Sequence, residues 1–228
     1  MRYYIFEPAC DTPETGSQYP QVQKMGAGYD FESSNSVRVL SKSYKDFPDF
    51  KPNFDYLVVH AQAKLTDLLS IAVIHGGFLI SERLKRVFEG LNIAPHRFYS
   101  AKLKHRKAFY ENYYWMYIIC NLSSFVDYKK SSFYVYDYFH SLGFIEVNSK
   151  EEYSQKEKKL KDKNPDKAVT IWAQKIYLNE SFDRNLDLFE IGTFNANYFI
   201  SERLGNAIIE EKITGCSITP TDNLIVSG

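Results

Sequence analysis

Residues 79–84 read LISERL and residues 199–204 read FISERL, so the five residues Ile80–Leu84 recur as Ile200–Leu204, 120 positions later. Each serine suits the N-cap of a helix, because its hydroxyl can accept a hydrogen bond from an unpaired amide of the first turn. Each glutamate then stands where the helix dipole favours negative charge. The similarity continues downstream at paired positions, namely Val87/Ala207, Phe88/Ile208 and Ile93/Ile213. The repeat therefore predicts two related helix starts, and capping explains it without a functional site.

Outward from the repeat, apolar residues at helical spacing predict helices over Phe78–Leu91 and Asn197–Glu211, and a short helix over Leu65–Ile74. The charged stretch 149–167 begins with helical character, and Pro165 ends it. Clusters of β-branched and aromatic residues predict nine strands. These are Arg2–Phe6, Phe54–Gln62, Arg97–Leu103, Tyr113–Cys120, Ser132–Tyr136, Phe144–Val147, Ala168–Leu178, Leu186–Ile191 and Cys216–Thr219.

These elements show no regular βαβ alternation, which favours an α+β fold over a doubly wound one. We predict a compact α+β protein with a mixed, largely antiparallel sheet and two related helix–strand units that carry the ISERL sequences. A length of 228 residues fits one large domain or two small ones. We expect a single domain over residues 1–228, loosely divided into halves 1–105 and 106–228.

The composition describes an ordinary folded protein that carries no net charge, since 28 basic residues balance 28 acidic ones. A protein that grips phosphate backbones usually has a positive excess, so we expect no nucleic-acid partner. The first ten residues lack the apolar region of a signal peptide, and the apolar stretches are too short to span a bilayer. Three scattered cysteines, Cys10, Cys120 and Cys216, suggest buried free thiols. We therefore expect a cytoplasmic protein without a membrane partner.

Motifs for chemistry are missing from the sequence. It contains no phosphate-binding glycine loop, no G-x-S-x-G and no H-E-x-x-H, so we predict no cofactor, no metal site and no catalytic residues. The best alternative is a hydrolase-type site of His60 and Asp67, with His75 as a further member. A histidine at the end of a strand beside a helix cap is, however, ordinary structure.

Aromatic residues are the compositional outlier, at 16% of the chain. In the segment Tyr113–Ile118, strand alternation places Tyr113, Trp115 and Tyr117 on one face and Tyr114, Met116 and Ile118 on the other. We rank a sheet core first and a protein interface second. A nucleic-acid platform beside the basic run Lys102–Lys107 ranks third. The candidate partner-binding residues are Tyr110, Tyr113, Trp115, Tyr117, Tyr134 and Tyr136.

The order of these signals resembles one bacterial family. The matching segments are HAQAKLTDLLS from His60, GGFLISERLKRVFEGLNIAPHRFYSAKL, YYWMYIICNLSSFVDYKKSSF, DLFEI and YFISERLGNAIIEEKITGCSI. Together they run from about Phe54 to Pro220 and resemble the eleventh numbered family of immunity proteins in bacterial polymorphic toxin systems, formerly a domain of unknown function. The charged insert around 150–167 is particular to this chain.

The resemblance implies a protein that binds a cognate toxin domain and neutralises it, protecting the producing cell. It carries over no catalytic residues. We expect neutralisation by steric occlusion in the cytoplasm, and hence a toxin with an intracellular target. A hydrolase using His60 and Asp67 and a nucleic-acid-binding module stay open as alternatives. The sequence sets neither the toxin nor the oligomeric state.

Overall fold

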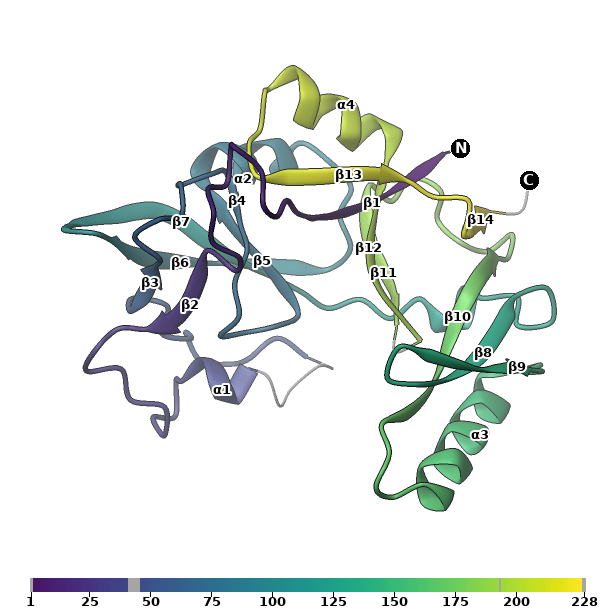
Figure 1. The fold of residues 1–228 in the computed structure, drawn as a ribbon. Helices are drawn as coiled ribbons and strands as arrows, with labels where there is room; N and C mark the ends of the chain where they lie inside the picture. The colour runs from purple at the N-terminus through teal and green to yellow at the C-terminus, as the bar shows by residue number, and fades with distance from the viewer. Residues whose placement is uncertain (1, 41–45, 193, 227–228) are drawn as a thin grey trace.

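The computed structural model describes residues 2–40, 46–192 and 194–226, whose strands form three sheets (Figure 1). The largest sheet has the order β2 (Val22–Met25), β3 (Leu57–Val59), β6 (His96–His105), β7 (Ala108–Ile118), β5 (Gly77–Ser81) and β4 (Leu68–Leu69). A second sheet has the order β11 (Leu188–Gly192), β12 (Asn195–Ser201), β1 (Tyr3–Pro8) and β13 (Cys216–Pro220). The third has the order β14 (Leu224–Val226), β10 (Val169–Leu178), β8 (Ser132–Asp137) and β9 (His140–Ile145).

The helices are few and short. They are α1 (Val37–Leu40), α2 (Glu82–Glu89), α3 (Lys150–Lys163), α4 (Glu202–Glu210) and a 3₁₀ turn at Ser123–Phe125. Helices α2 and α4 lie at the same end of the molecule, and α3 covers the sheet of β10 and β8 (Figure 1). Among the described strands only the pairs β3–β6 and β10–β14 run parallel, so the predicted α+β class with largely antiparallel sheets is confirmed.

Strand β7 separates two hydrophobic cores. Its residues Met116 and Ile118 belong to a core shared with α2, α4 and the two smaller sheets. Tyr113, Trp115 and Tyr117 belong to a second core, which is built with β2, β3 and α1. The predicted alternation along this strand is therefore confirmed. The boundary between residues 105 and 106 falls at the turn of the β6–β7 hairpin, and the division into two halves stays a prediction.

The two helices that start within the repeated sequence begin later than predicted. Residues Gly77–Ser81 and Asn195–Ser201 are strands, and the helices start at Glu82 and Glu202. The reason is that Phe78, Leu79 and Ile80 are all buried, because β5 pairs with β7 and packs on both faces. A strand buried on both sides reads as a continuous apolar run, and spacing alone does not tell it from the start of a helix.

The predicted short helix over Leu65–Ile74 is wrong. Leu68 and Leu69 form β4 against β5, and the Ser70 carbonyl accepts a hydrogen bond of 2.9 Å from the Val22 amide. Strand pairing thus takes the backbone groups that a helix would have used. The short elements β2, α1 and β14 were not predicted, because each has only three or four residues and no repeating apolar pattern.

We expect Trp115→Ala to destabilise the protein by about 3–5 kcal/mol, because removal of a large buried ring leaves a cavity. Trp115 is fully buried, and its ring stacks on Phe54 with centroids 5.7 Å apart. In a thermal melt the midpoint should fall by roughly 10 °C for a chain of this length. Phe109→Ala is the control, since Phe109 lies on the same strand and is exposed. Equal melting of the two variants would contradict the core assignment.

Candidate functional site

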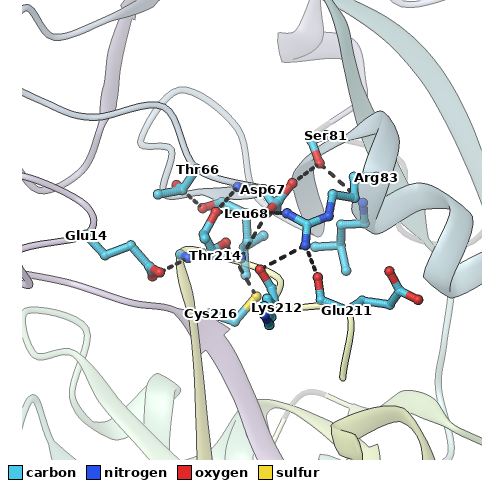
Figure 2. Close-up of polar contacts among 12 residues, drawn as sticks. Glu14, Thr66, Asp67, Leu68, Ser81, Arg83, Glu211, Lys212, Thr214 and Cys216 are labelled. Atoms are coloured by element: carbon cyan, nitrogen blue, oxygen red, sulfur yellow. Dashed lines mark hydrogen bonds and ion pairs between the residues drawn. The ribbon is translucent and has the colours of Figure 1, made fainter. Parts of the chain in front are cut away.

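Asp67 is the centre of a polar cluster, shown in Figure 2, that links α2 to the segment after α4. Its Oδ1 accepts a hydrogen bond of 2.6 Å from the Ser81 hydroxyl. Its Oδ2 accepts bonds from the Thr214 amide and hydroxyl, at 2.9 and 2.8 Å, and pairs with the Arg83 guanidinium at 3.4 Å. We call Asp67, Ser81, Arg83 and Thr214 the Asp67 cluster. It joins segments 147 residues apart.

Arg83 also reaches the C-terminal end of α4, where it donates hydrogen bonds to the carbonyl oxygens of Glu211 and Lys212 (Figure 2). Carbonyls at the end of a helix lack intrahelical partners and carry partial negative charge, so a guanidinium is favourable there. A side chain of the first repeat thus caps the helix of the second.

Asp187 is the centre of a matching cluster 120 positions later. Its Oδ1 accepts from the Ser201 hydroxyl at 2.5 Å, and Arg203 forms an ion pair with both carboxylate oxygens. The amide of Asn92, in the segment after α2, donates to Oδ2 at 2.8 Å. We call Asp187, Ser201, Arg203 and Asn92 the Asp187 cluster. The aspartate of each repeat therefore holds the chain that leaves the other repeat's helix.

Each repeated serine both accepts and donates a hydrogen bond through its hydroxyl. Ser81 and Ser201 are the N-caps of α2 and α4, and their hydroxyls accept from the amides of Leu84 and Leu204 at 3.2 and 3.1 Å. Each hydroxyl donates its proton to the aspartate of its own cluster. Four of the five shared residues are thus explained by structure: a buried apolar strand end, a cap, an ion pair and a first buried helical residue.

Asp187 is the more deeply buried of the two aspartates, since none of its surface is exposed. Burial works to raise the pKa of its carboxyl, but hydrogen bonds from Arg203, Ser201 and the Asn92 amide outweigh it and hold the pKa below the ordinary value. The carboxylate therefore stabilises the fold at neutral pH, and this contribution is lost as the pH falls through the lowered pKa.

The alternative pair His60 and Asp67 is not brought together. The His60 ring accepts a hydrogen bond of 3.2 Å from the Gln62 amide, while Asp67 is occupied by its own cluster. Within the described ranges, no polar contact joins His60 to Asp67. Nor do these ranges contain three or more His, Cys, Asp or Glu side chains arranged to hold a metal ion.

The basic run Lys102–Lys107 forms the end and the turn of the β6–β7 hairpin. Lys102 pairs with Glu111 at 2.6 Å, and the Arg106 guanidinium donates to the Ala61 carbonyl at 3.1 Å. Two of its cationic groups are therefore already engaged. In α3, the pairs Lys156–Glu152 and Lys161–Glu157 are the weak surface ion pairs that the sequence predicts.

The six candidate partner-binding aromatics fall into two groups. Tyr113, Trp115 and Tyr117 are buried in the second core, whereas Tyr110, Tyr134 and Tyr136 are partly exposed. The Tyr136 hydroxyl accepts a hydrogen bond of 2.7 Å from Gln174. Their role in partner binding stays a prediction, and only the partly exposed group has side-chain surface available for it.

The β8–β9 hairpin carries an exposed apolar surface, of which only Tyr134 was among the candidate partner-binding residues. Four large apolar side chains there are 60–95% exposed, with Phe139 the highest. In register, Phe144 of β9 pairs with Tyr134 of β8, which in turn pairs with Trp172 of β10. We call this set the hairpin patch: Tyr134, Tyr138, Phe139, Leu142, Phe144 and Trp172. Its signal in the sequence is the aromatic alternation of residues 134–138 followed by Phe139 in a turn.

Tyr134, Phe144 and Trp172 of the patch lie on the face of the third sheet away from α3. Phe133 points to the other face, where its ring lies 6.2 Å from that of Tyr153 in α3, and successive strand residues face opposite sides. The rings of Tyr134 and Phe144 contact each other with centroids 5.7 Å apart. Strand β9 is also an edge of its sheet. Clustered apolar side chains beside an open edge are unusual unless a partner covers them.

The profile of the Immunity protein family (Imm11) matches residues 5–223, nearly the whole chain. The chain therefore belongs to the Imm11 family of immunity proteins, and the resemblance inferred from sequence is confirmed. No curated protein matches the chain. In the part of the chain that the structure describes, no helix has both the length and the hydropathy needed to cross a bilayer.

We expect Asp187→Asn to lower the stability at pH 7 by about 2 kcal/mol, because it removes hydrogen bonds to a charged acceptor. Asp222→Asn, at an exposed position, is the control. Denaturant unfolding at several pH values should show the gap between wild type and Asp187→Asn starting to close below about pH 4, the ordinary pKa of an aspartate in an unfolded chain, and closing further as the pH approaches the lowered pKa of the folded carboxyl. A gap that stays constant down to pH 2 would contradict the assignment of the ion pair.

Proposed function

We propose that this protein neutralises a cognate toxin domain of a polymorphic toxin system by binding it and covering its working surface. The observation that supports this most is the exposed hairpin patch on a member of an immunity protein family. Occlusion requires a stable interface and no bond-making groups, and an apolar sheet face beside an open edge strand suits such an interface.

The composition of the hairpin patch suits tight binding. Interface energy usually comes from a few large side chains near the centre of the contact, most often Trp, Tyr and Arg. Here the row Phe144, Tyr134 and Trp172 crosses three paired strands, so the backbone is held by the sheet before the partner arrives. A preformed surface loses less entropy on binding than a flexible loop. Tyr136, also partly exposed, lies beside this row on β8.

We place the encounter in the cytoplasm, and we therefore expect a toxin that acts on an intracellular target. The described cysteines support a reducing compartment, because all three are free. Cys10 is exposed and the other two are half-buried, so the prediction that all three are buried was wrong. A toxin from the adjacent reading frame that kills only when it is sent to the periplasm would contradict the cytoplasmic assignment.

Phe139→Ser combined with Phe144→Ser should weaken the affinity for the cognate toxin by at least about tenfold, since exposed anchors would be lost. We expect the toxin to be the C-terminal domain of a large protein encoded in the adjacent reading frame, and the assay uses it in a catalytically inactive form. The thermal midpoint should hardly change, because both side chains are mostly exposed. The measurement is the Kd by calorimetry, with the oligomeric state of each variant checked by light scattering.

Phe109→Ser is the matched control, because Phe109 is exposed on a different sheet. Undiminished affinity in the double variant would overturn the hairpin patch as the toxin-binding surface. A wild-type dimer that the double variant dissociates would instead assign the patch to a second copy of the chain.

His60→Ala should leave protection of toxin-producing cells unchanged, because steric occlusion uses no reactive group at this position. The hydrolase alternative gives the opposite result, a folded variant that still binds toxin and no longer protects. The measurement is the survival of cells that express the toxin with each variant, with binding checked separately.

A further inference from the structure

A cleft of about 630 Å³ lies between the sheet of β1 and β12 and the ends of β5 and β7. The residues that matter for its chemistry are Glu7, Phe78, Cys120, Asn121, Glu190 and Tyr198. None of them belongs to the hairpin patch or to the two aspartate clusters. Its volume is within the range of small-molecule sites in proteins.

The charged side chains that line the described part of the cleft are carboxylates. Glu7 and Glu190 line it, and neither lysine nor arginine is among the described residues that do. Glu190 and Tyr198 are paired across β11 and β12, so their side chains lie on the same face of the sheet. In the described part of the chain, no group donates a hydrogen bond to the Glu190 carboxylate.

Burial raises the pKa of Glu190 to about 7. At neutral pH the Glu190 carboxyl is therefore charged in about half of the molecules. The neighbouring side chains of Cys120 and Tyr198 do not supply a positive charge that would pair with the Glu190 carboxylate. Burial also raises the pKa of the Cys120 thiol, to about 11, and that of the Tyr198 hydroxyl, so both are neutral. Glu7 is exposed at the rim, and His75 also lines the cleft. A carboxyl held in this way gains most from a ligand that brings a positive charge.

Aromatic rings line the same cleft. The rings of Phe78 and Tyr198 have centroids 4.5 Å apart, and both residues belong to its wall. A cation gains energy from the face of an aromatic ring as well as from a carboxylate, and an aliphatic stem gains from apolar walls.

We propose that this cleft binds a guanidinium or ammonium group on an apolar stem, with the Glu190 carboxylate as its counter-ion. Such a group can come from an arginine or lysine side chain of the toxin or from a free organic amine. The site rests on the cleft itself. Only its assignment to a toxin side chain rests on the proposed function.

The test uses pentylguanidinium as the probe and pentylurea as its neutral counterpart of the same shape. Calorimetry at pH 8 should show pentylguanidinium binding to the wild type at least about tenfold more tightly than pentylurea. Glu190→Gln should remove this preference, because a charge-assisted hydrogen bond is lost. Glu7→Gln, at the exposed rim, is the matched control and should keep most of it.

The affinity for pentylguanidinium should also rise about tenfold between pH 6 and pH 8, since the charged fraction of a carboxyl with a pKa near 7 rises by that factor. Equal binding of the two probes to the wild type would overturn the proposal, and so would a preference that survives in Glu190→Gln.

The source of the group is found by measuring the affinity of Glu190→Gln for the toxin. A loss of about tenfold identifies a basic side chain of the toxin, and an unchanged Kd identifies a free organic cation. This experiment does not involve the hairpin patch. If the Phe139→Ser/Phe144→Ser variant binds toxin as well as the wild type, the result for the cleft is unaffected. If the cleft does not bind pentylguanidinium, the test of the hairpin patch is likewise unaffected.

Discussion

The fold depends on an exchange of contacts between two buried aspartates. Asp67 holds the chain after α4, and Asp187 holds the chain after α2. Each carboxylate also fixes the serine that caps its own helix and pairs with the arginine two residues further on. Removing either acid would leave buried donors without an acceptor, which costs more than the bond itself contributes. The exchange explains why the same short sequence occurs twice, 120 positions apart.

This link accompanies direct packing of α2 against α4, which lie side by side at one end of the molecule (Figure 1). The third sheet lies at the lower right of Figure 1, away from α2. It carries an exposed aromatic face, and its opposite face is covered by α3. Under the proposed function, this arrangement lets the binding surface be apolar while the core stays covered.

Strong local patterns in the sequence predicted much of this structure. The alternation around Trp115 gave the correct division between the two cores, and Ser149 starts the predicted charged helix at its expected place. Local patterns failed at Phe78 and Leu68, because burial on both faces of a strand removes the alternation that distinguishes strand from helix. Spacing also could not show that Asp67 and Thr214 meet, since their contact joins residues 147 positions apart. The exposure of Phe139 and the isolation of Glu190 are equally properties of the tertiary structure.

The measurement that tests the central claim most directly is hydrogen–deuterium exchange of the protein with and without its inactivated toxin. If the protein acts by occlusion through the third sheet, amides of residues 132–145 become protected in the complex, while those of the β6–β7 turn exchange as before. Protection confined to other elements, or a toxin that is chemically altered after contact with the protein, would contradict the account.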